Sequence, residues 1–430
     1  MTTAARAPLQ PRESMGAPRS TVAARLRSTG FRLGPLPVVN LVVLEIGFAL
    51  GLMLLAMDTA LWWAALGVLL IAVPLALGRW HGHWLVRWVQ FTACYLLRSH
   101  SRSTTSPDPV AADGPSSTLQ PVGGSDDPRL ALLRLFLPDL SIAHGTDHQR
   151  EPLGLTWHQG TWTTVFEVDA APSMITPVGG SPSLPLGALA PCLNHRGVVL
   201  DTIQVIWHCY PGSTALPSSS PALCSYLEVL GPLPAAARRT TWVAVRLDPR
   251  RCPTAVAERG GGVMGCHRAL IGALSRVRSA LESRGMPTRP LDADQLLRAG
   301  ISAAELSAAA GTGRAVTLSE RWTAVTAAGV GHASYVISGW GARGVAHNLN
   351  ALTGVRALSA TVALSLAPGE DGAEVGLRGL VRVSARNPGE LEAAERRLQA
   401  VSQRLGVVLS PLHGLQVAGL AATLPLGAPR

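Results

Sequence analysis

The chain has 430 residues, of which 37 are basic and 27 acidic, and its formal net charge is +10 at pH 7. Every basic residue is arginine, so the chain cannot form a Walker A phosphate loop, a Schiff base or a pyridoxal anchor, each of which needs lysine. A P-loop ATP motor and lysine-dependent covalent catalysis are therefore excluded for this chain.

Residues 1–35 form a basic arm that we expect to be disordered. Two apolar segments follow, residues 37–57 and 60–78, joined by two residues alone. At 1.5 Å rise per residue the segments are about 31 and 28 Å long, which matches a hydrocarbon core of about 30 Å. Residues 36–78 are therefore predicted to form a transmembrane helical hairpin. A secretory signal fits poorly, because a second span follows at once and no cleavage site is present.

Arginines on both sides of the hairpin predict its orientation. They are Arg6, Arg12, Arg19, Arg25, Arg27 and Arg32 before it and Arg79, Arg87, Arg98 and Arg102 after it. Because cytoplasmic loops collect Lys and Arg, we expect a multi-pass protein of the inner (plasma) membrane with cytoplasmic N- and C-termini. Residues 103–430 hold 27 arginines against 24 acids. The charge is thus mostly juxtamembrane, which favours membrane lipids rather than nucleic acid as a partner.

Small residues on the first span predict a helix contact. Asn40, Gly47 and Gly51 fall on one stripe of a helical wheel, which packs either on the second helix of the hairpin or on another protein. We favour the first alternative. Glu45 falls on roughly the opposite face, where a carboxylate is costly unless it is protonated, reaches water or faces another protein. We expect all four residues to be membrane packing or partner contacts, with Glu45 directed at a partner subunit.

Residues 79–100 are predicted to form a juxtamembrane helix with an aromatic stripe among arginines. We expect an interfacial anchor in the headgroup layer, while a helix of the soluble domain and an extension of the second span are the alternatives. The predicted anchor residues are Arg79, Trp80, Trp84, Arg87, Trp88, Phe91 and Tyr95.

Residues 101–127 are rich in Ser, Pro, Gly and Asp and are predicted to be a flexible linker. Residues 128–430 are predicted to be an α+β (mixed α/β) cytoplasmic domain of one unit or two. We find no internal repeat in this region. Strands are expected within residues 154–168, 199–210, 240–247, 315–324, 333–338, 358–366 and 377–383, and amphipathic helices at 268–283 and 390–405.

Motifs for chemistry are weak. Gly260, Gly262 and Gly265 match G-x-G-x-x-G, but no strand directly precedes them, so a flexible helix N-terminus is favoured over a dinucleotide site. His144, Asp147 and His148, with His158 nearby, could form a metal cluster, although three polar residues in a predicted loop are usually only solvated. The six cysteines lack C-x-x-C spacing, so reduced, mostly buried thiols are expected. We predict no catalytic residue, no metal and no cofactor.

The arrangement as a whole resembles the EccE family of the actinobacterial type VII (ESX) secretion machinery. The likeness rests on the basic arm ending in STGFRLGPLPVVNLVVLEIGF, the tight hairpin, the RWHGHWLVRW stretch, the Ser/Pro linker, and the RGGGVMGCHRAL and HASYVISGW blocks. The resemblance implies a non-catalytic structural subunit of an inner-membrane secretion complex with EccB, EccC and EccD, in which EccC carries the ATPase activity. The alternative is a membrane-tethered enzyme or nucleotide-binding regulator.

Overall fold

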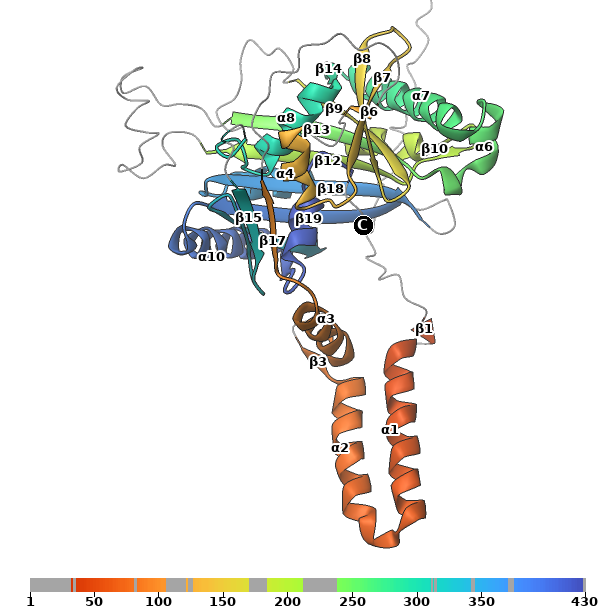
Figure 1. Ribbon diagram of the computed structural model, residues 1–430, viewed down its shortest axis with the longest axis vertical. Helices are drawn as coiled ribbons and strands as arrows, with labels where there is room; N and C mark the ends of the chain where they lie inside the picture. Colours follow the sequence, from red (N-terminus) through yellow and green to blue (C-terminus); the bar gives the residue numbers. More distant parts are fainter. Residues whose placement is uncertain are drawn as a thin grey trace, which may run out of the picture.

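The computed structural model comprises a large domain of sheet and helices from which two long helices project (Figure 1). The described residues are 32–33, 36–80, 83–105, 121–122, 127–169, 184–211, 238–310, 312, 315–341, 345–369 and 375–427. Most of the basic arm, and of the linker beyond residue 105, lies outside these ranges.

The projecting helices form the predicted hairpin. α1 spans Val38–Met57 and α2 spans Trp62–Leu77, with the 3-10 turn η1 (Thr59–Leu61) between them. Asp58 starts the turn, because its carboxylate accepts a hydrogen bond from the Ala60 backbone N–H (2.9 Å). The prediction of two long apolar helices joined by a tight turn is confirmed. Each helix is long and apolar enough to cross a membrane.

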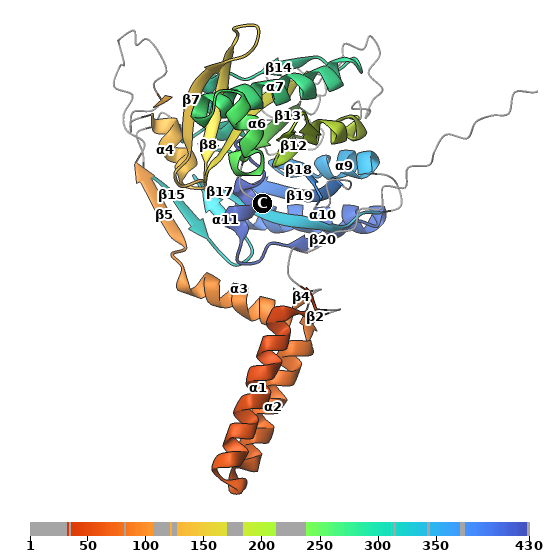
Figure 2. The same cartoon turned by 90° about the vertical axis from the view of Figure 1, so that its right-hand side faces the viewer.

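Short ribbons border the hairpin at its open end. They are β1 (Arg32–Leu33) with β2 (Leu36–Pro37), and β3 (Arg79–Trp80) with β4 (His83–Trp84). α3 (Leu85–Leu97) comes next and lies between the hairpin and the domain (Figure 2). The helix predicted over residues 79–100 is therefore shorter than expected, because β3 and β4 occupy its first part.

One 14-stranded sheet forms the centre of the domain. Its strands lie in the order β5-β15-β16-β17-β19-β18-β12-β13-β9-β8-β7-β6, with β14 beside β9 and β20 beside β17. All pairings in this sheet are antiparallel. The strands are β5 (Ser101–Thr105), β6 (Pro121–Val122), β7 (Ser141–Thr146), β8 (Pro152–His158), β9 (Thr161–Val168), β12 (Thr202–Tyr210), β13 (Arg238–Leu247), β14 (Thr288–Pro290), β15 (Ala315–Glu320), β16 (Val325–Ala327), β17 (Val330–Gly339), β18 (Ser359–Pro368), β19 (Val375–Ala385) and β20 (Val408–Pro411).

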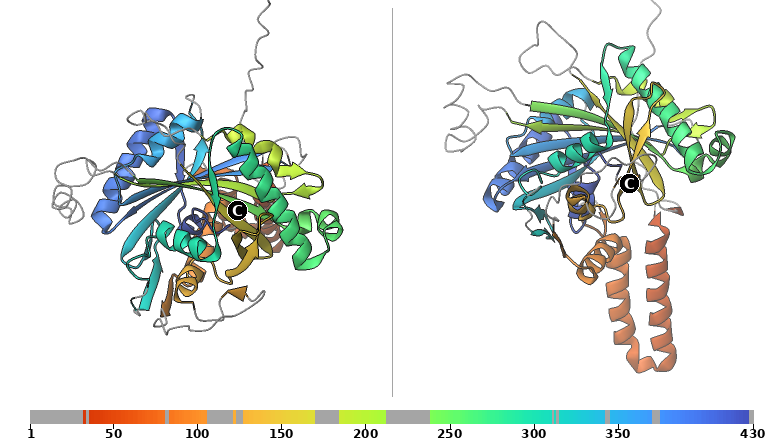
Figure 3. Two further views of the ribbon diagram at one scale, coloured as in Figure 1. Left: turned by 90° about the horizontal axis from the view of Figure 1, so that it is seen from above. Right: turned by 45° about the horizontal axis from the view of Figure 1, so that its top comes forward.

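Helices cover both faces of the sheet (Figure 3). Side chains of the central strands alternate between two apolar cores, as Val205 and Ile206 of β12 do. One core lies beneath α7, α9 and α10, and the other beneath α4, α8 and α11. These helices are α4 (Pro128–Arg134), α7 (Gly262–Glu282), α8 (Ala293–Ala303), α9 (Val345–Thr353), α10 (Pro388–Leu405) and α11 (Gln416–Ala421). The α+β class is confirmed, and each predicted strand and helix range contains an element of that type.

The domain consists of two halves with the same topology. In each half a three-stranded meander is followed by a hairpin, a long helix, a short strand and a last helix. The third strand of the meander pairs with the second strand of the hairpin and with the short strand, as β9 does with β13 and β14, and β17 with β19 and β20. β12 pairs with β18 and joins the halves. The expectation that the chain has no internal repeat is therefore wrong.

Matched residues make the repeat specific. The Leu291 N–H donates to the Val165 carbonyl oxygen, and the Leu412 N–H donates to the Ser334 carbonyl oxygen, both at 3.0 Å. Each leucine lies in a P-L-x-x-x-Q sequence that begins the last helix of its half. Few side chains are shared beyond this, which is why the sequence pattern alone did not reveal the duplication.

Two local predictions are corrected. The linker predicted over residues 101–127 is not flexible throughout, since Ser101–Thr105 pair with β15. Such pairing needs only backbone N–H and C=O groups, so a Ser/Thr-rich segment can serve as an edge strand. The prediction that His144 lies in a loop is also wrong, because His144 lies in β7 and pairs with Gly154.

Candidate assembly site

The inner face of the hairpin is built from the predicted stripe of small residues on α1. Asn40 is 2% exposed and donates from Nδ2 to the Ala76 carbonyl oxygen of α2 (2.7 Å). A Cβ on Gly47 would overlap the Ala72 side chain, so the helices meet at a distance that only glycine allows. Gly51 is buried further along the same face. The stripe thus packs within the hairpin, which is the alternative that we favoured.

The outer face of the hairpin carries Glu45, which is exposed. Its neighbours on the surface are large apolar side chains such as Ile46 and Leu52, 61% and 65% exposed. A surface of this composition is suited to lipid or to another apolar helix, and a soluble domain rarely exposes so much apolar area.

Gly78 makes the corner between α2 and α3. Its N–H donates to the Pro74 carbonyl oxygen (2.7 Å), and its own carbonyl oxygen accepts from the Leu85 N–H (3.0 Å). A side chain at this position would overlap both the Pro74 carbonyl and Leu85. The corner therefore fixes the direction in which α3 leaves the hairpin.

Arg98, directly after α3, ties this segment to the domain. Its guanidinium forms an ion pair with the Glu320 carboxylate at the end of β15 and donates to the Gly414 carbonyl oxygen (2.8 Å). The Glu320 side chain is 3% exposed, and its second oxygen accepts from the Val417 N–H at the start of α11 (3.0 Å). Both oxygens of this buried carboxylate are thus partnered, as a buried charge requires.

Aromatic rings extend the same contact. The ring centroids of Trp88 and Tyr95 on α3 lie 5.7 and 5.2 Å from that of Trp322, in edge-to-face geometry. On its other side Trp322 stacks on His413 at 5.8 Å. Trp88 and Tyr95, two of the predicted headgroup anchors, therefore contact the domain, and their place in the headgroup layer stays a prediction. The side chains of the other five, Arg79, Trp80, Trp84, Arg87 and Phe91, lie outside the described part of the structure.

A buried polar cluster lies between the sheet and α8. Arg382 of β19 is 0% exposed and donates to the Ala303 carbonyl oxygen and to the Thr361 hydroxyl oxygen (3.0 Å). His208 shares a hydrogen bond of 2.8 Å between its Nδ1 and that hydroxyl. Its Nε2 lies 3.5 Å from a carboxylate oxygen of Glu305. The cluster connects three central strands, β12, β18 and β19, to the end of α8.

The electrostatics of this cluster follow from its burial. Burial, assisted by the Arg382 charge, lowers the pKa of His208 to about 3, so the ring is neutral at pH 7. Burial also lowers the pKa of Arg382 to about 10, against the opposing effect of Glu305, and raises the pKa of Glu305. Groups of this kind could transfer protons, but His208 is only 1% exposed and Arg382 is not exposed at all. The geometry suits packing rather than contact with a substrate.

The other motifs fall at structural positions. Gly260 and Gly262 have φ of +108° and +53° at the start of α7, and a Cβ on Gly265 would overlap the Val256 carbonyl of α6 (Pro253–Glu258). A helix rather than a strand precedes this loop, so it lacks the setting of a dinucleotide turn. Asp147 pairs with Arg278 (3.7 Å). Within the described ranges, no group of three His, Cys, Asp or Glu side chains is placed to hold a metal ion.

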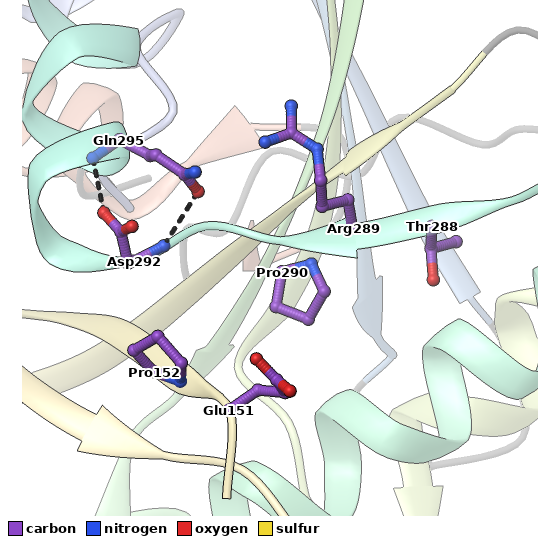
Figure 4. A pocket seen from close by; sticks show the side chains of 7 residues that line it. All are labelled: Glu151, Pro152, Thr288, Arg289, Pro290, Asp292 and Gln295. Carbon is purple, nitrogen blue, oxygen red and sulfur yellow. Dashed lines mark hydrogen bonds between the residues drawn. The ribbon is translucent and has the colours of Figure 1, made fainter. Parts of the chain in front are cut away.

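A cavity of about 330 Å³ lies between the start of β8, β14 and the start of α8 (Figure 4). The Asp292 carboxylate accepts from the Gln295 N–H (2.7 Å), and the Gln295 side chain accepts from the Asp292 N–H (3.2 Å). Arg289 pairs with Glu167 (2.7 Å). These groups already cap α8 or balance one another, so the cavity offers no free catalytic pair. Its lining residues are Glu151, Pro152, Thr288, Arg289, Pro290, Asp292 and Gln295.

Sequence reasoning missed the domain side of the α3 contact. The sequence identifies Arg98 only as a juxtamembrane charge. Its neighbours in the domain, Glu320, Trp322 and His413, lie more than 200 residues away in the chain. The spacing of Tyr95 and Arg98, one turn apart at the end of a helix, was the available signal for a common contact.

Comparison with known proteins finds similarity to one family. The sequence model of the family described as "putative type VII ESX secretion system translocon, EccE" matches residues 235–337, from β13 to β17. The chain is 28% identical to the ESX-5 secretion system protein EccE5 of Mycobacterium marinum, over 40% of this chain and 43% of that protein. It is 23% identical to the ESX-1 secretion system protein EccE1 of Mycobacterium tuberculosis, over 54% of this chain and 43% of that one. The matched segments thus span less than half of these relatives. The resemblance found in the sequence is confirmed.

Proposed function

We propose, from the premise that this chain is an EccE-family component of type VII secretion, that it is a non-catalytic structural subunit of an inner-membrane secretion complex. The observation that carries the proposal is the joint between hairpin and domain. Gly78 fixes α3 on the hairpin, and Arg98 fixes it on Glu320. A subunit with such a joint can hold a cytoplasmic domain in a set position beside the membrane.

The exposed apolar surface of α1 and α2 supports a membrane location. Both helices match the length of a hydrocarbon core, and their large side chains face outward. Arginines before and after the hairpin favour cytoplasmic placement of both its ends and of the domain. The inner membrane and a two-span topology are part of this proposal.

Partner contacts are assigned to the outer face of the hairpin. Since the small residues are used inside the hairpin, Glu45 remains as the polar group on the outer face of α1. A carboxylate at this depth is stabilised by a hydrogen bond from a partner helix. The family resemblance names EccB, EccC and EccD as the partners.

A non-catalytic role is supported by the chemistry of the domain. The chain lacks lysine, and its one cluster of proton-transfer groups described above is inaccessible. In the cavity of Figure 4, Asp292 and Gln295 are hydrogen-bonded to each other, and Arg289 is paired with Glu167 outside the lining.

Purification of the tagged full chain in mild detergent tests this function. We expect other secretion-complex subunits to co-purify in fixed ratio. Glu45→Leu should reduce their recovery, whereas Ile46→Leu, at the next exposed position, should leave it unchanged. Recovery of this chain alone, with both the native and the Ile46→Leu proteins, would contradict the proposal.

A further inference from the structure

Arginines gather on one surface of the domain beside few acids. Residues 249–286 hold seven arginines and two glutamates, whereas residues 103–430 as a whole are nearly neutral. Four of the seven are paired with acids: Arg250 with Asp248, Arg251 with Asp201, Arg259 with Glu258, and Arg278 with Asp147 and Glu282. The remaining charge lies along α7 and at its start, so it forms a local basic region in a balanced domain.

Contacts make this region continuous. Arg268 Nη1 donates to the Arg259 carbonyl oxygen (2.9 Å), and Arg259 Nη2 donates to the Arg196 carbonyl oxygen (3.5 Å). Arg196 belongs to the turn between β10 (Asn194–His195) and β11 (Val198–Val199). We call Arg196, Arg259, Arg268 and Arg276 the α7 arginine surface.

Mutual repulsion acts on Arg276 within the α7 arginine surface. Burial lowers the pKa of Arg276, and the charges of Arg259 and Arg196 lower it further. The Nε and one Nη of Arg276 are buried without a hydrogen-bond partner within the described residues. Arg276 is half-buried, so a carboxylate beside it would supply the charge partner that a buried guanidinium normally has.

The start of α7 adds donors and an apolar element. Its N-cap is Gly261, which has no side chain to cap the helix, and the first turn contains no acid. The first N–H groups of this 21-residue helix therefore have no side-chain cap and carry a partial positive charge. Val263 and Met264, in this same turn, are 63% and 48% exposed. Two adjacent exposed apolar side chains beside arginines are typical of a protein-binding surface.

The position of α6 and α7 in the molecule decides whether the acidic ligand is a lipid or a protein. α6 and α7 lie at the end of the domain that points away from α1 and α2 (Figures 1 and 2). A bilayer that holds the hairpin does not reach this end. The acidic ligand therefore comes from the aqueous side.

We infer that the α7 arginine surface, with Val263 and Met264, docks an acidic segment of a partner protein that carries apolar side chains between its carboxylates. The carboxylates pair with the arginines and with the helix N-terminus, and the apolar side chains cover Val263 and Met264. This inference rests on the proposed function, because it names the kind of partner that the domain of such a subunit binds.

A peptide-binding experiment on the full chain in non-ionic micelles tests the inference. The probe is a fluorescent peptide of repeated Glu-Glu-Leu triplets, and its fluorescence anisotropy reports binding. We expect saturable binding that weakens as salt increases. Arg196→Glu/Arg268→Glu should weaken it by at least about tenfold. Arg396→Glu/Arg404→Glu, on α10 in the other half, changes the net charge equally and should change the affinity by less than about twofold.

The remaining arms separate the rival outcomes. Val263→Ser/Met264→Ser should weaken binding of this peptide but not of an all-Glu peptide of equal length. Equal losses in the α7 and α10 variants would overturn the inference, and so would tighter binding to phosphatidylglycerol vesicles or duplex RNA than to the peptide. Unfolding temperatures of all variants establish that they are folded. If the peptide does not bind as expected while other subunits still co-purify through the hairpin, the inference about the α7 arginine surface is wrong and the proposed function stands.

Discussion

Arg98 and Glu320, 222 residues apart in the chain, form the ion pair that joins the hairpin segment to the sheet. One partner follows α3, and the other ends the strand next to β5. Because the same carboxylate also accepts from the start of α11, the pair links three elements of the structure. The stability of the joint between α3 and the domain depends on this ion pair.

Removing Arg98 should loosen this joint. Arg98→Ala leaves the Glu320 carboxylate buried without its cation, and we expect a loss of about 1–2 kcal/mol in the free energy of unfolding, moderated because Arg98 is 37% exposed. Urea unfolding of the full chain in micelles measures it. Arg396→Ala is the matched control, since Arg396 and its partner Glu392 are both mostly exposed, and it should have no measurable effect. Equal effects of the two substitutions would show that the joint is not held by this pair.

A larger residue at Gly47 should separate the two helices of the hairpin. Gly47→Leu places a side chain where Ala72 already lies, so we expect a lower aggregation temperature in micelles. Gly67→Leu is the control on α2, because no atom lies within 4 Å of a Cβ at that position. If Gly67→Leu proved the more harmful of the two, the helix contact described above would be wrong.

Acid should destabilise the domain partly through His208. The pKa of His208 is about 3 in the folded chain and about 6.5 when unfolded, so the unfolded chain binds the extra proton. Its contribution to stability is complete above pH 6.5 and is lost as the pH falls toward 3. Glu305, whose pKa is raised by burial, acts in the opposite direction at low pH.

His208→Gln should therefore flatten the dependence of stability on pH. The expected change in slope is up to about 1.4 kcal/mol per pH unit, measured by urea unfolding between pH 7 and pH 5. His148→Gln, at an exposed position, serves as the control. An unchanged slope in His208→Gln would mean that the ring already carries a proton in the folded chain.

Thiol reagents should react slowly with the folded domain. Cys192, Cys209, Cys252 and Cys266 are free and buried, and burial raises the pKa of each thiol. Since the thiolate is the reactive form, we expect much slower labelling in the native chain than in denaturant. Peptide mapping after timed alkylation measures each site separately. Fast labelling of any of the four in native buffer would contradict its burial.

Local patterns were sufficient for much of the fold. The apolar lengths of α1 and α2, the period-2 runs of the central strands and the 3.6-residue periodicity of α7 and α10 each follow from side chains close together in sequence. The inward stripe of Asn40, Gly47 and Gly51 could be predicted for the same reason. Family resemblance supplied the secretion context.

Long-range pairing could not be predicted. Ser101–Thr105 become a strand only because the β15 edge is available, and nothing in those five residues names that partner. The cluster of His208, Arg382 and Glu305 likewise brings together residues from two strands and a helix end. The α3 contact with Trp322 depends on where the domain places its last strands and helices, so a helical wheel of α3 alone does not show it.

The junction between β12 and β18 has a consequence for the symmetry of the molecule. When two copies of one unit associate across a two-fold axis, their equivalent edge strands pair in antiparallel orientation, as these two strands do. The domain therefore has the architecture of a symmetric dimer contained in one chain. The halves differ in what surrounds this frame, since one receives α3 and the other carries a long β7–β8 hairpin and the arginine-lined α7.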